Sequence, residues 1–147
     1  MTLRIGSGNR DIRLRKYSSG GILLSWSIRF CAEFSAEFEQ YENAVKRELI
    51  GQLRLLEMLG PALGRPHVDA LKGSRHANMK ELRFTAGDGV WRMAMAFAFD
   101  PARSAILLVA GDKGGMSEKL FYRGLIRRAD DRFDRHLSYG GKNVQDT

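Results

Sequence analysis

The chain has 147 residues, of which 44% are hydrophobic and 28% are charged, and its formal net charge is +7. A chain of this length can bury the core of one domain unaided, and its single cysteine excludes disulfide scaffolds and zinc ribbons. Its apolar runs are shorter than the roughly 20 residues of a membrane span, and its positive charge makes nucleic acid the first class of partner to consider.

Much of the positive charge lies before the first predicted element. Residues 1–21 contain five basic residues, one acidic residue and seven Gly or Ser residues, without apolar periodicity. We predict a disordered basic extension there, a single domain over residues 22–138, and a flexible tail over residues 139–147. Because the chain after the extension has a net charge of only about +3, the placement of charge within the domain matters more than the total.

The domain is predicted to begin with a strand and a helical stretch. Residues 22–30 (ILLSWSIRF) alternate as a strand does. From residue 32 to residue 59, apolar side chains recur at helical spacing. Asn43 is a candidate cap for a second helix, so one long helix and a helical hairpin both remain open. Gly60 and Pro61 predict the end of this stretch.

Three strands are predicted in the second half. Residues 61–78 are polar and rich in turn formers, which indicates a connection. Lys80–Thr85 and Val90–Phe99 then alternate as two strands, and Ala86–Gly89 between them is typical of a hairpin turn. Ala105–Ala110 is apolar on both faces, as a central strand is.

A last amphipathic helix is predicted up to Leu137, with Ser117 as its N-cap. The predicted order is therefore β-α-α-β-β-β-α. This order indicates an α+β fold with a small, mainly antiparallel sheet, two helices near the N-terminus and one at the C-terminus.

The hairpin register predicts a cluster of positive charge. With Gly87 and Asp88 at the turn, Arg83 lies opposite Arg92, and both point away from the apolar side of the hairpin. Two like charges facing each other need a neutralising group. The acidic neighbour Glu81 is one candidate, and a bound phosphate is the other.

Further polar groups are expected at the same end of the sheet. Lys113 follows the last strand, which runs back antiparallel, and Lys119 and Tyr122 come after only a short loop. A solvated face on which Arg83 simply pairs with Glu81 is the alternative explanation for this pattern.

No metal or cofactor is expected. His67 and His76 lack a third ligand at a suitable spacing, and the loop Gly111–Gly115 does not have the spacing of a phosphate-binding loop. The chain begins without the apolar stretch of a secretory signal and has a single cysteine, so we expect a cytoplasmic protein.

Three segments carry a family resemblance: LGRPHVDALKGSRHANMKELRF, VWRMAMAFAFDPARSAILLVAGDKGG and SEKLFYRGLIRRADDRFDRHL. They resemble the phage-derived relatives of the HigB/RelE toxins of bacterial toxin-antitoxin modules. The resemblance covers about residues 22–138 and implies a RelE-like fold. It also implies a ribosome-dependent endoribonuclease that cuts messenger RNA without metal, through attack of the ribose 2′-hydroxyl. The implied partners are the ribosome, the mRNA and a cognate antitoxin, often of the helix-turn-helix type.

The resemblance implies roles for particular residues. Arg92 matches the arginine that binds the scissile phosphate, Lys113 the basic residue after the last strand, and Tyr122 the aromatic residue that stacks on or orients the base. Relatives carry lysines along the middle strand, where this chain has Lys80, Glu81 and Arg83. Glu81, Lys80 and His76 therefore all remain candidates for the general base. The expected catalytic group is Arg92, Arg83, Lys113, Glu81 and Tyr122, and the expected RNA-binding group is Lys72, Arg75, His76, Lys80 and Lys119.

Two other interpretations stay open. The chain could be a non-catalytic module that binds nucleic acid or an antitoxin, such as an inactive toxin homologue. It could also be an accessory protein without a nucleic-acid role, which complete pairing of Arg83 and Arg92 with acidic side chains would favour.

Overall fold

The computed structural model describes residues 10–12, 25–98 and 103–142. The elements in chain order are β1 (Arg10–Ile12), β2 (Ser27–Phe30), α1 (Ala32–Glu39), α2 (Asn43–Leu59), the 3-10 turn η1 (Gly60–Ala62), β3 (Val68–Ala70), β4 (Met79–Ala86), β5 (Gly89–Ala98), β6 (Ser104–Asp112) and α3 (Glu118–Lys142).

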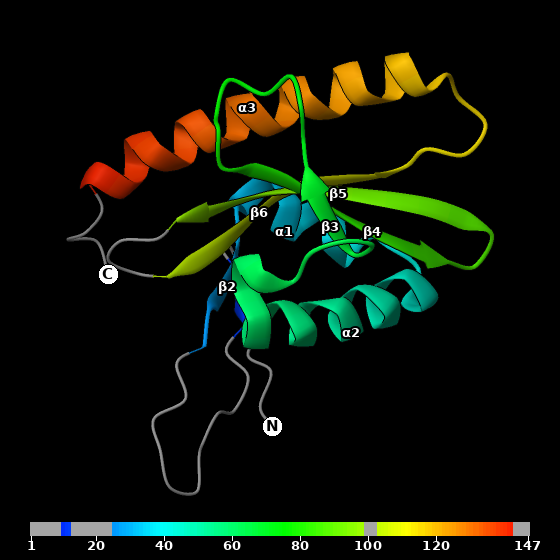
Figure 1. Cartoon of the computed structure of the whole chain (residues 1–147), viewed down its shortest axis with the longest axis horizontal. Helices are drawn as coiled ribbons and strands as arrows, with labels where there is room; N and C mark the ends of the chain where they lie inside the picture. The colour runs from blue at the N-terminus through cyan, green and yellow to red at the C-terminus, as the bar shows by residue number, and fades with distance from the viewer. Residues whose placement is uncertain (1–9, 13–24, 99–102, 143–147) are drawn as a thin grey trace, which may run out of the picture.

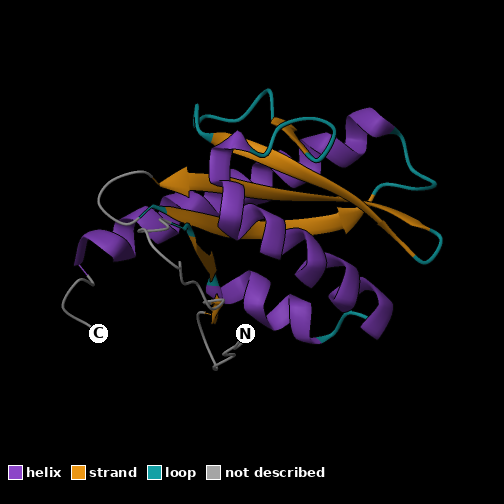
Figure 2. Ribbon diagram, turned by 60° about the horizontal axis from the view of Figure 1, so that its bottom comes forward, coloured by secondary structure: helices purple, strands orange, loops and turns teal. Residues whose placement is uncertain are grey.

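The strands form one six-stranded sheet in the order β1-β2-β6-β5-β4-β3. Figure 2 shows the sheet in orange and the helices in purple. Every neighbouring pair is antiparallel except β2 with β6, which is parallel. Strand β6 lies between β2 and β5, which confirms the prediction of a central strand from its apolar sequence. The predicted α+β class with a mainly antiparallel sheet is also confirmed.

Helices cover both faces of the sheet (Figure 1). The two N-terminal helices pack on one face, where Leu82 and Phe84 of β4 are buried beneath α2. Helix α3 packs on the other face and buries Phe121 and Leu125. Because successive side chains of a strand point to opposite faces, β4 presents Glu81 and Arg83 to α3 and Leu82 and Phe84 to α2.

The helical stretch is a hairpin. Helix α1 ends at Glu39 and α2 begins at Asn43, so the sequence encodes two helices. Asn43 is the first residue of α2 and Glu42 occupies the cap position, which corrects the predicted cap by one residue. Helix α2 ends before Gly60, whose φ is +52°. A side chain has no room there, because a Cβ on Gly60 would lie 2.3 Å from Nε1 of Trp26.

Three short segments differ from the sequence prediction. Strand β3 lies within the connection predicted over residues 61–78, and β1 lies within the extension predicted to be disordered. Both are edge strands of the sheet and have only three residues, which is too short for a periodicity to be detected. Helix α3 continues to Lys142, past the predicted start of the tail. The other residues of the extension, 1–9 and 13–21, and of the tail, 143–147, lie outside the described residues.

The two helical layers are joined past the end of β2. Arg132 of α3 is buried, and its Nη1 donates to the backbone oxygen of Leu108 at 2.8 Å. The same guanidinium forms two hydrogen bonds with Glu37 of α1, at 2.8 and 2.7 Å. Within the described part of the chain, no helix combines the length and the apolar character needed to cross a membrane.

Candidate functional site

The β4–β5 hairpin sets the register of the site. Arg83 pairs with Arg92, Phe84 with Trp91, and Ala86 with Gly89, as the sequence predicts. The turn allows this register because Gly87 adopts a φ of +59°. The two arginines therefore lie side by side on the face that α3 covers.

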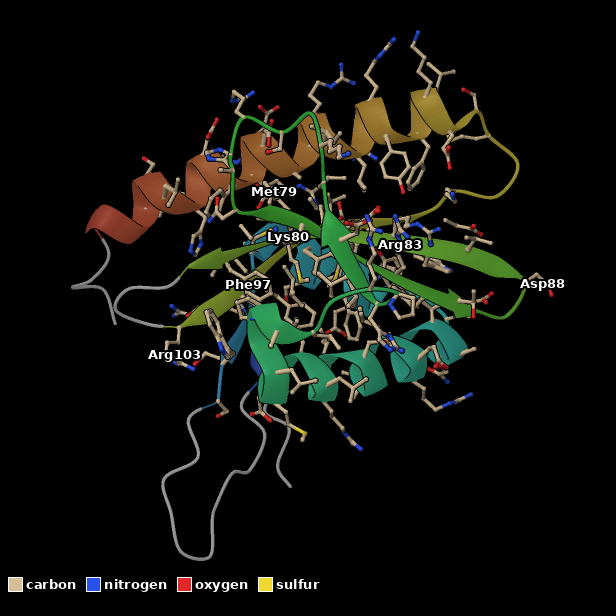
Figure 3. All side chains as sticks on the ribbon, in the orientation of Figure 1. Met79, Lys80, Arg83, Asp88, Phe97 and Arg103 are labelled. Carbon is tan, nitrogen blue, oxygen red and sulfur yellow. The ribbon has the colours of Figure 1, made fainter. Side chains whose placement is uncertain are left out.

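Glu81 is the buried acidic residue of this face, with 3% of its surface exposed. Its Oε2 accepts hydrogen bonds from Nε and Nη2 of Arg83, at 3.0 and 2.8 Å. Nη2 of Arg83 also lies 3.4 Å from Asp69 of β3. The hydrogen bond to Glu81 is the main reason why the pKa of Arg83 is raised. Figure 3 shows Arg83 among nitrogen- and oxygen-bearing side chains between the sheet and α3. Carboxylates thus neutralise Arg83, as the sequence allowed.

Tyr122 of α3 joins Glu81 to the second arginine. Its hydroxyl donates to Oε1 of Glu81 at 2.7 Å and accepts from Nε of Arg92 at 3.2 Å. Burial, and then the hydrogen bond to Glu81, raise the pKa of Tyr122 above its ordinary value. The phenol is therefore neutral near pH 7 and keeps the proton that it donates to Glu81.

Arg92 differs from Arg83 in how it is held. Its Nη1 donates to the backbone oxygen of Trp91 at 3.0 Å, and its Nε donates to Tyr122. The nearest distance to a carboxylate within the described ranges, 3.9 Å from Nε to Oε1 of Glu81, is too long for a hydrogen bond. A guanidinium has five N–H donors, so this arrangement fixes Arg92 by two neutral contacts and leaves donors for a further anion.

Lys113 lies at the same end of the sheet. Its backbone N–H donates to Val90 at 2.8 Å, and its Nζ contacts Glu118 at 2.7 Å. The pKa of Glu118 is lowered chiefly by Lys113 and, to a smaller extent, by Arg92 and Arg83. The carboxylate of Glu118 therefore lies in the positive field of all three cations.

The helix that carries Tyr122 begins at this end. Ser117 accepts a hydrogen bond from the backbone N–H of Leu120 at 3.3 Å, so it is the N-cap that the sequence predicts. Lys119 is exposed in the first turn of α3, next to Glu118 in the sequence.

Three of the predicted RNA-binding residues lie elsewhere. Lys72, Arg75 and His76 belong to the loop between β3 and β4, which packs on the C-terminal half of α3. Nε2 of His76 lies 2.8 Å from Asp134, and Arg75 pairs with the same carboxylate. The structure therefore does not bring His76 to the arginines, because α3 holds this loop at a separate place.

Lys80 is also separated from the arginines. It precedes Glu81 in β4, so its side chain belongs to the face that carries Leu82 and α2. We call Arg83 and Arg92, with Glu81 and Tyr122 between them, the arginine cluster. Among the three residues considered as a general base, only Glu81 belongs to this cluster.

Sequence reasoning missed two acidic residues that contact the basic side chains of the site, Asp69 beside Arg83 and Glu118 beside Lys113. Asp69 was overlooked because β3 is too short to show a strand pattern, and Glu118 because its pairing with Lys113 depends on how the loop before α3 folds. Within the described ranges, no three His, Cys, Asp or Glu side chains gather in a way that would hold a metal ion.

Comparison with known proteins gives a family and two relatives. The family described as "Phage derived protein Gp49-like (DUF891)" matches residues 36–134. HigB3 of Mycobacterium tuberculosis, whose name assigns it provisionally as a toxin, is 50% identical over 111 residues, which are 71% of this chain and 93% of HigB3. HigB2 of the same organism, named in the same provisional way, is 45% identical over 100 residues, 65% of this chain. This chain spans about half of HigB2, 49% of its length.

No solved structure matches the chain with significance. The family match covers most of the domain and includes β3 to β6 and most of α3, which together hold the arginine cluster. The chain therefore belongs to the Gp49-like family of phage-derived proteins, in the HigB-like group that its sequence segments resemble.

Proposed function

We propose that this protein is the toxin of a type II toxin-antitoxin module, and that it acts in the cytoplasm as a metal-independent endoribonuclease on mRNA bound to the ribosome. The provisional names of HigB2 and HigB3 support the toxin assignment. The observation that carries the ribonuclease assignment is Arg92, a shielded arginine that is positioned without a carboxylate hydrogen bond. A cognate antitoxin, of the helix-turn-helix type, would neutralise it.

The proposed reaction has three chemical needs. A base must take the proton of the 2′-hydroxyl, positive charge must stabilise the phosphorane, and an acid must protonate the leaving 5′-oxygen. Arg92 meets the second need, because its remaining N–H groups form a planar fork suited to a phosphate. Arg83 supports it from the facing strand by holding Glu81 in place.

Glu81 and Tyr122 are the proposed base system. Tyr122 takes the proton of the 2′-hydroxyl as it passes its own proton to Oε1 of Glu81, along the 2.7 Å hydrogen bond. The 2′-oxygen then bonds to phosphorus, and the bond from phosphorus to the 5′-oxygen breaks. Lys113 supplies a proton to that oxygen, which leaves a 2′,3′-cyclic phosphate on one product and a 5′-hydroxyl on the other.

The proposed function is tested with ribosomes programmed with mRNA. We expect the purified chain to generate fragments with 2′,3′-cyclic phosphate ends, and to arrest growth when it is expressed alone. Arg92→Ala should abolish both effects. Arg103→Gln is the matched control, since Arg103 precedes β6 at its far end from Lys113 and contacts the ring of Trp26.

A non-catalytic module is the second candidate. The observation in its favour is that carboxylates engage both Arg83 and Lys113. It predicts RNA binding that weakens with salt but leaves no cyclic phosphate ends. Well-folded protein that binds programmed ribosomes and does not cleave the mRNA would establish this candidate instead of the first.

A further inference from the structure

Helix α2 carries a feature that the proposed reaction does not use. A hollow of about 360 Å³ lies on its outer side, lined by Lys46, Arg47, Ile50, Gly51 and Arg54. The buried face of α2 is formed by other positions, among them Leu49 and Leu53, and packs on the sheet. The hollow is therefore on the surface, and Figure 1 shows that its helix, α2, lies on the side of the sheet away from α3.

The hollow has an apolar floor and charged ends. Ile50 and Gly51 lie in its middle, and Gly51 leaves the backbone bare, because a Cβ at this position would have no neighbour within 4 Å. Arg47 and Arg54 are both exposed and lie seven residues apart, which is about 10 Å along a helix. Lys46 adds a third cation beside Arg47.

The exposed apolar surface continues past the second arginine. Met58 lies one turn beyond Arg54 on the same side of α2, and 64% of its surface is exposed. Glu48, although it is close in sequence, is not among the residues that line the hollow. Within the described residues, neither Arg47 nor Arg54 is seen in an ion pair, so the positive charge of this face is available to a partner.

Gly51 lowers the stability of helix α2. In an exposed helix interior, glycine is one of the least favourable residues, and here no turn or close contact requires it. Its effect is to keep the floor of the hollow open between the two arginines. A local choice that opposes helix stability is expected where the surface has a binding role.

We propose that this face of α2 binds an acidic amphipathic helix of a partner protein. Two carboxylates seven positions apart on such a helix match the spacing of Arg47 and Arg54, and the third and fourth positions between them lie on the same face and place apolar side chains over Ile50 and Gly51. A nucleic-acid backbone would leave this apolar floor unused, because phosphates carry no apolar group. The observations therefore favour a peptide over RNA.

This binding face and the arginine cluster lie on opposite sides of the sheet. A partner bound on α2 leaves Arg92 and Tyr122 uncovered, because the sheet separates the two places. The inference does not depend on the ribonuclease activity, and it holds equally for a non-catalytic homologue.

The probe is a synthetic helical peptide of about 20 residues, long enough to be helical on its own, in which two glutamates seven positions apart flank two leucines. We expect Arg47→Glu with Arg54→Glu to weaken its binding more than about tenfold. A peptide with lysines in place of the glutamates should restore binding to this double variant. Arg123→Glu with Arg127→Glu, two exposed arginines of α3, is the control with the same change of charge and should bind as wild type does.

Two further variants test the floor. Gly51→Phe should fill the hollow and abolish binding, whereas Gly51→Ala should retain it with a higher melting temperature. Arg92→Ala should leave peptide binding unchanged. The proposal would be overturned if the α2 and α3 charge reversals weakened peptide binding equally. It would also be overturned if the α2 reversal weakened the binding of a single-stranded RNA oligonucleotide as much as the binding of the peptide, because this face would then bind anions in general.

Discussion

Arg83 and Arg92 face each other across β4 and β5, and of these two arginines only Arg83 is hydrogen-bonded to a carboxylate of the described chain. The difference arises from the neighbours. Arg83 shares its strand with Glu81 and lies near Asp69 of β3, whereas Arg92 is held by a phenol and a backbone carbonyl. Two residues of one type in paired positions are therefore held differently, and the proposed function gives them different tasks, one structural and one directed to an anion.

The first prediction separates these two tasks. Arg92→Ala should lower the rate of RNA cleavage by about 100- to 1,000-fold, as the loss of one group that stabilises the transition state does, with little change in stability. Arg83→Ala should instead lower the free energy of unfolding by about 1–3 kcal/mol, because buried Glu81 loses two hydrogen bonds. Urea denaturation and the yield of cyclic phosphate ends measure the two effects. A stability loss as large in the first variant as in the second would contradict this division.

The second prediction concerns the phenol that connects the strands to α3. Tyr122→Phe keeps the ring and removes only the hydroxyl, which bonds both Glu81 and Arg92. We expect a loss of about 1–3 kcal/mol in unfolding free energy and slower RNA cleavage. Tyr139→Phe is the matched control, since Tyr139 of the same helix is 67% exposed and its substitution should change neither quantity. Unaltered cleavage by Tyr122→Phe would remove the phenol from the mechanism.

The third prediction concerns the loop that holds Lys72, Arg75 and His76. Asp130 of α3 is buried and accepts hydrogen bonds from the hydroxyl of Ser74 and the backbone N–H of Arg75. Asp130→Ala should therefore destabilise the protein by about 1–3 kcal/mol.

Asp131→Ala provides the control for this loop, because Asp131 is exposed and its contact with Arg75 is long, at 3.5 Å. An exposed pair of this kind contributes little to stability. Thermal unfolding of the two variants should therefore differ, and equal melting temperatures would show that the loop is not fixed through Asp130.

The fourth prediction concerns pH. Cys31 is buried, its thiol lies 3.5 Å from the backbone oxygen of Leu108, and burial raises its pKa from the ordinary 9.0 to about 11. Between pH 9 and pH 11, the thiol of Cys31 therefore keeps its proton in the folded state and loses it in the unfolded state. This contribution to stability is complete below pH 9 and is lost as the pH rises toward 11.

The measurements for Cys31 are direct. At pH 8 the native protein should resist alkylation by iodoacetamide, and the protein unfolded in guanidinium should react, as mass spectrometry can show. Cys31→Ala should flatten the decline of stability between pH 9 and pH 11. Rapid alkylation of the native protein would mean that the thiol is accessible.

The fifth prediction concerns α2. Gly51→Ala should raise the free energy of unfolding by about 1 kcal/mol, because alanine is the better helix former and its Cβ meets no neighbour. Gly60→Ala is the contrasting change, since Gly60 has a φ of +52° and adjoins Trp26, and it should destabilise. Denaturant titrations of both variants test the contrast, which fails if the two substitutions shift stability in the same direction.

Much of the fold follows from local patterns. The alternation in β4 and β5, the glycines of the hairpin turn and the apolar run of β6 each indicate their element without reference to the rest of the chain. Ser117 and Gly60 mark helix ends for equally local reasons of hydrogen bonding and backbone conformation. The three-residue edge strands β1 and β3 have no such signal, because they exist only through pairing with β2 and β4.

For the candidate site, the sequence by itself determined that Arg83 and Arg92 lie together and that Glu81 shares their face, because strand parity and turn geometry are local properties. Only the tertiary structure decided which arginine is neutralised. That outcome depends on Asp69 and Tyr122, which arrive from β3 and α3 and whose positions are fixed by packing across the sheet. The same packing placed His76 against α3 and away from the arginines.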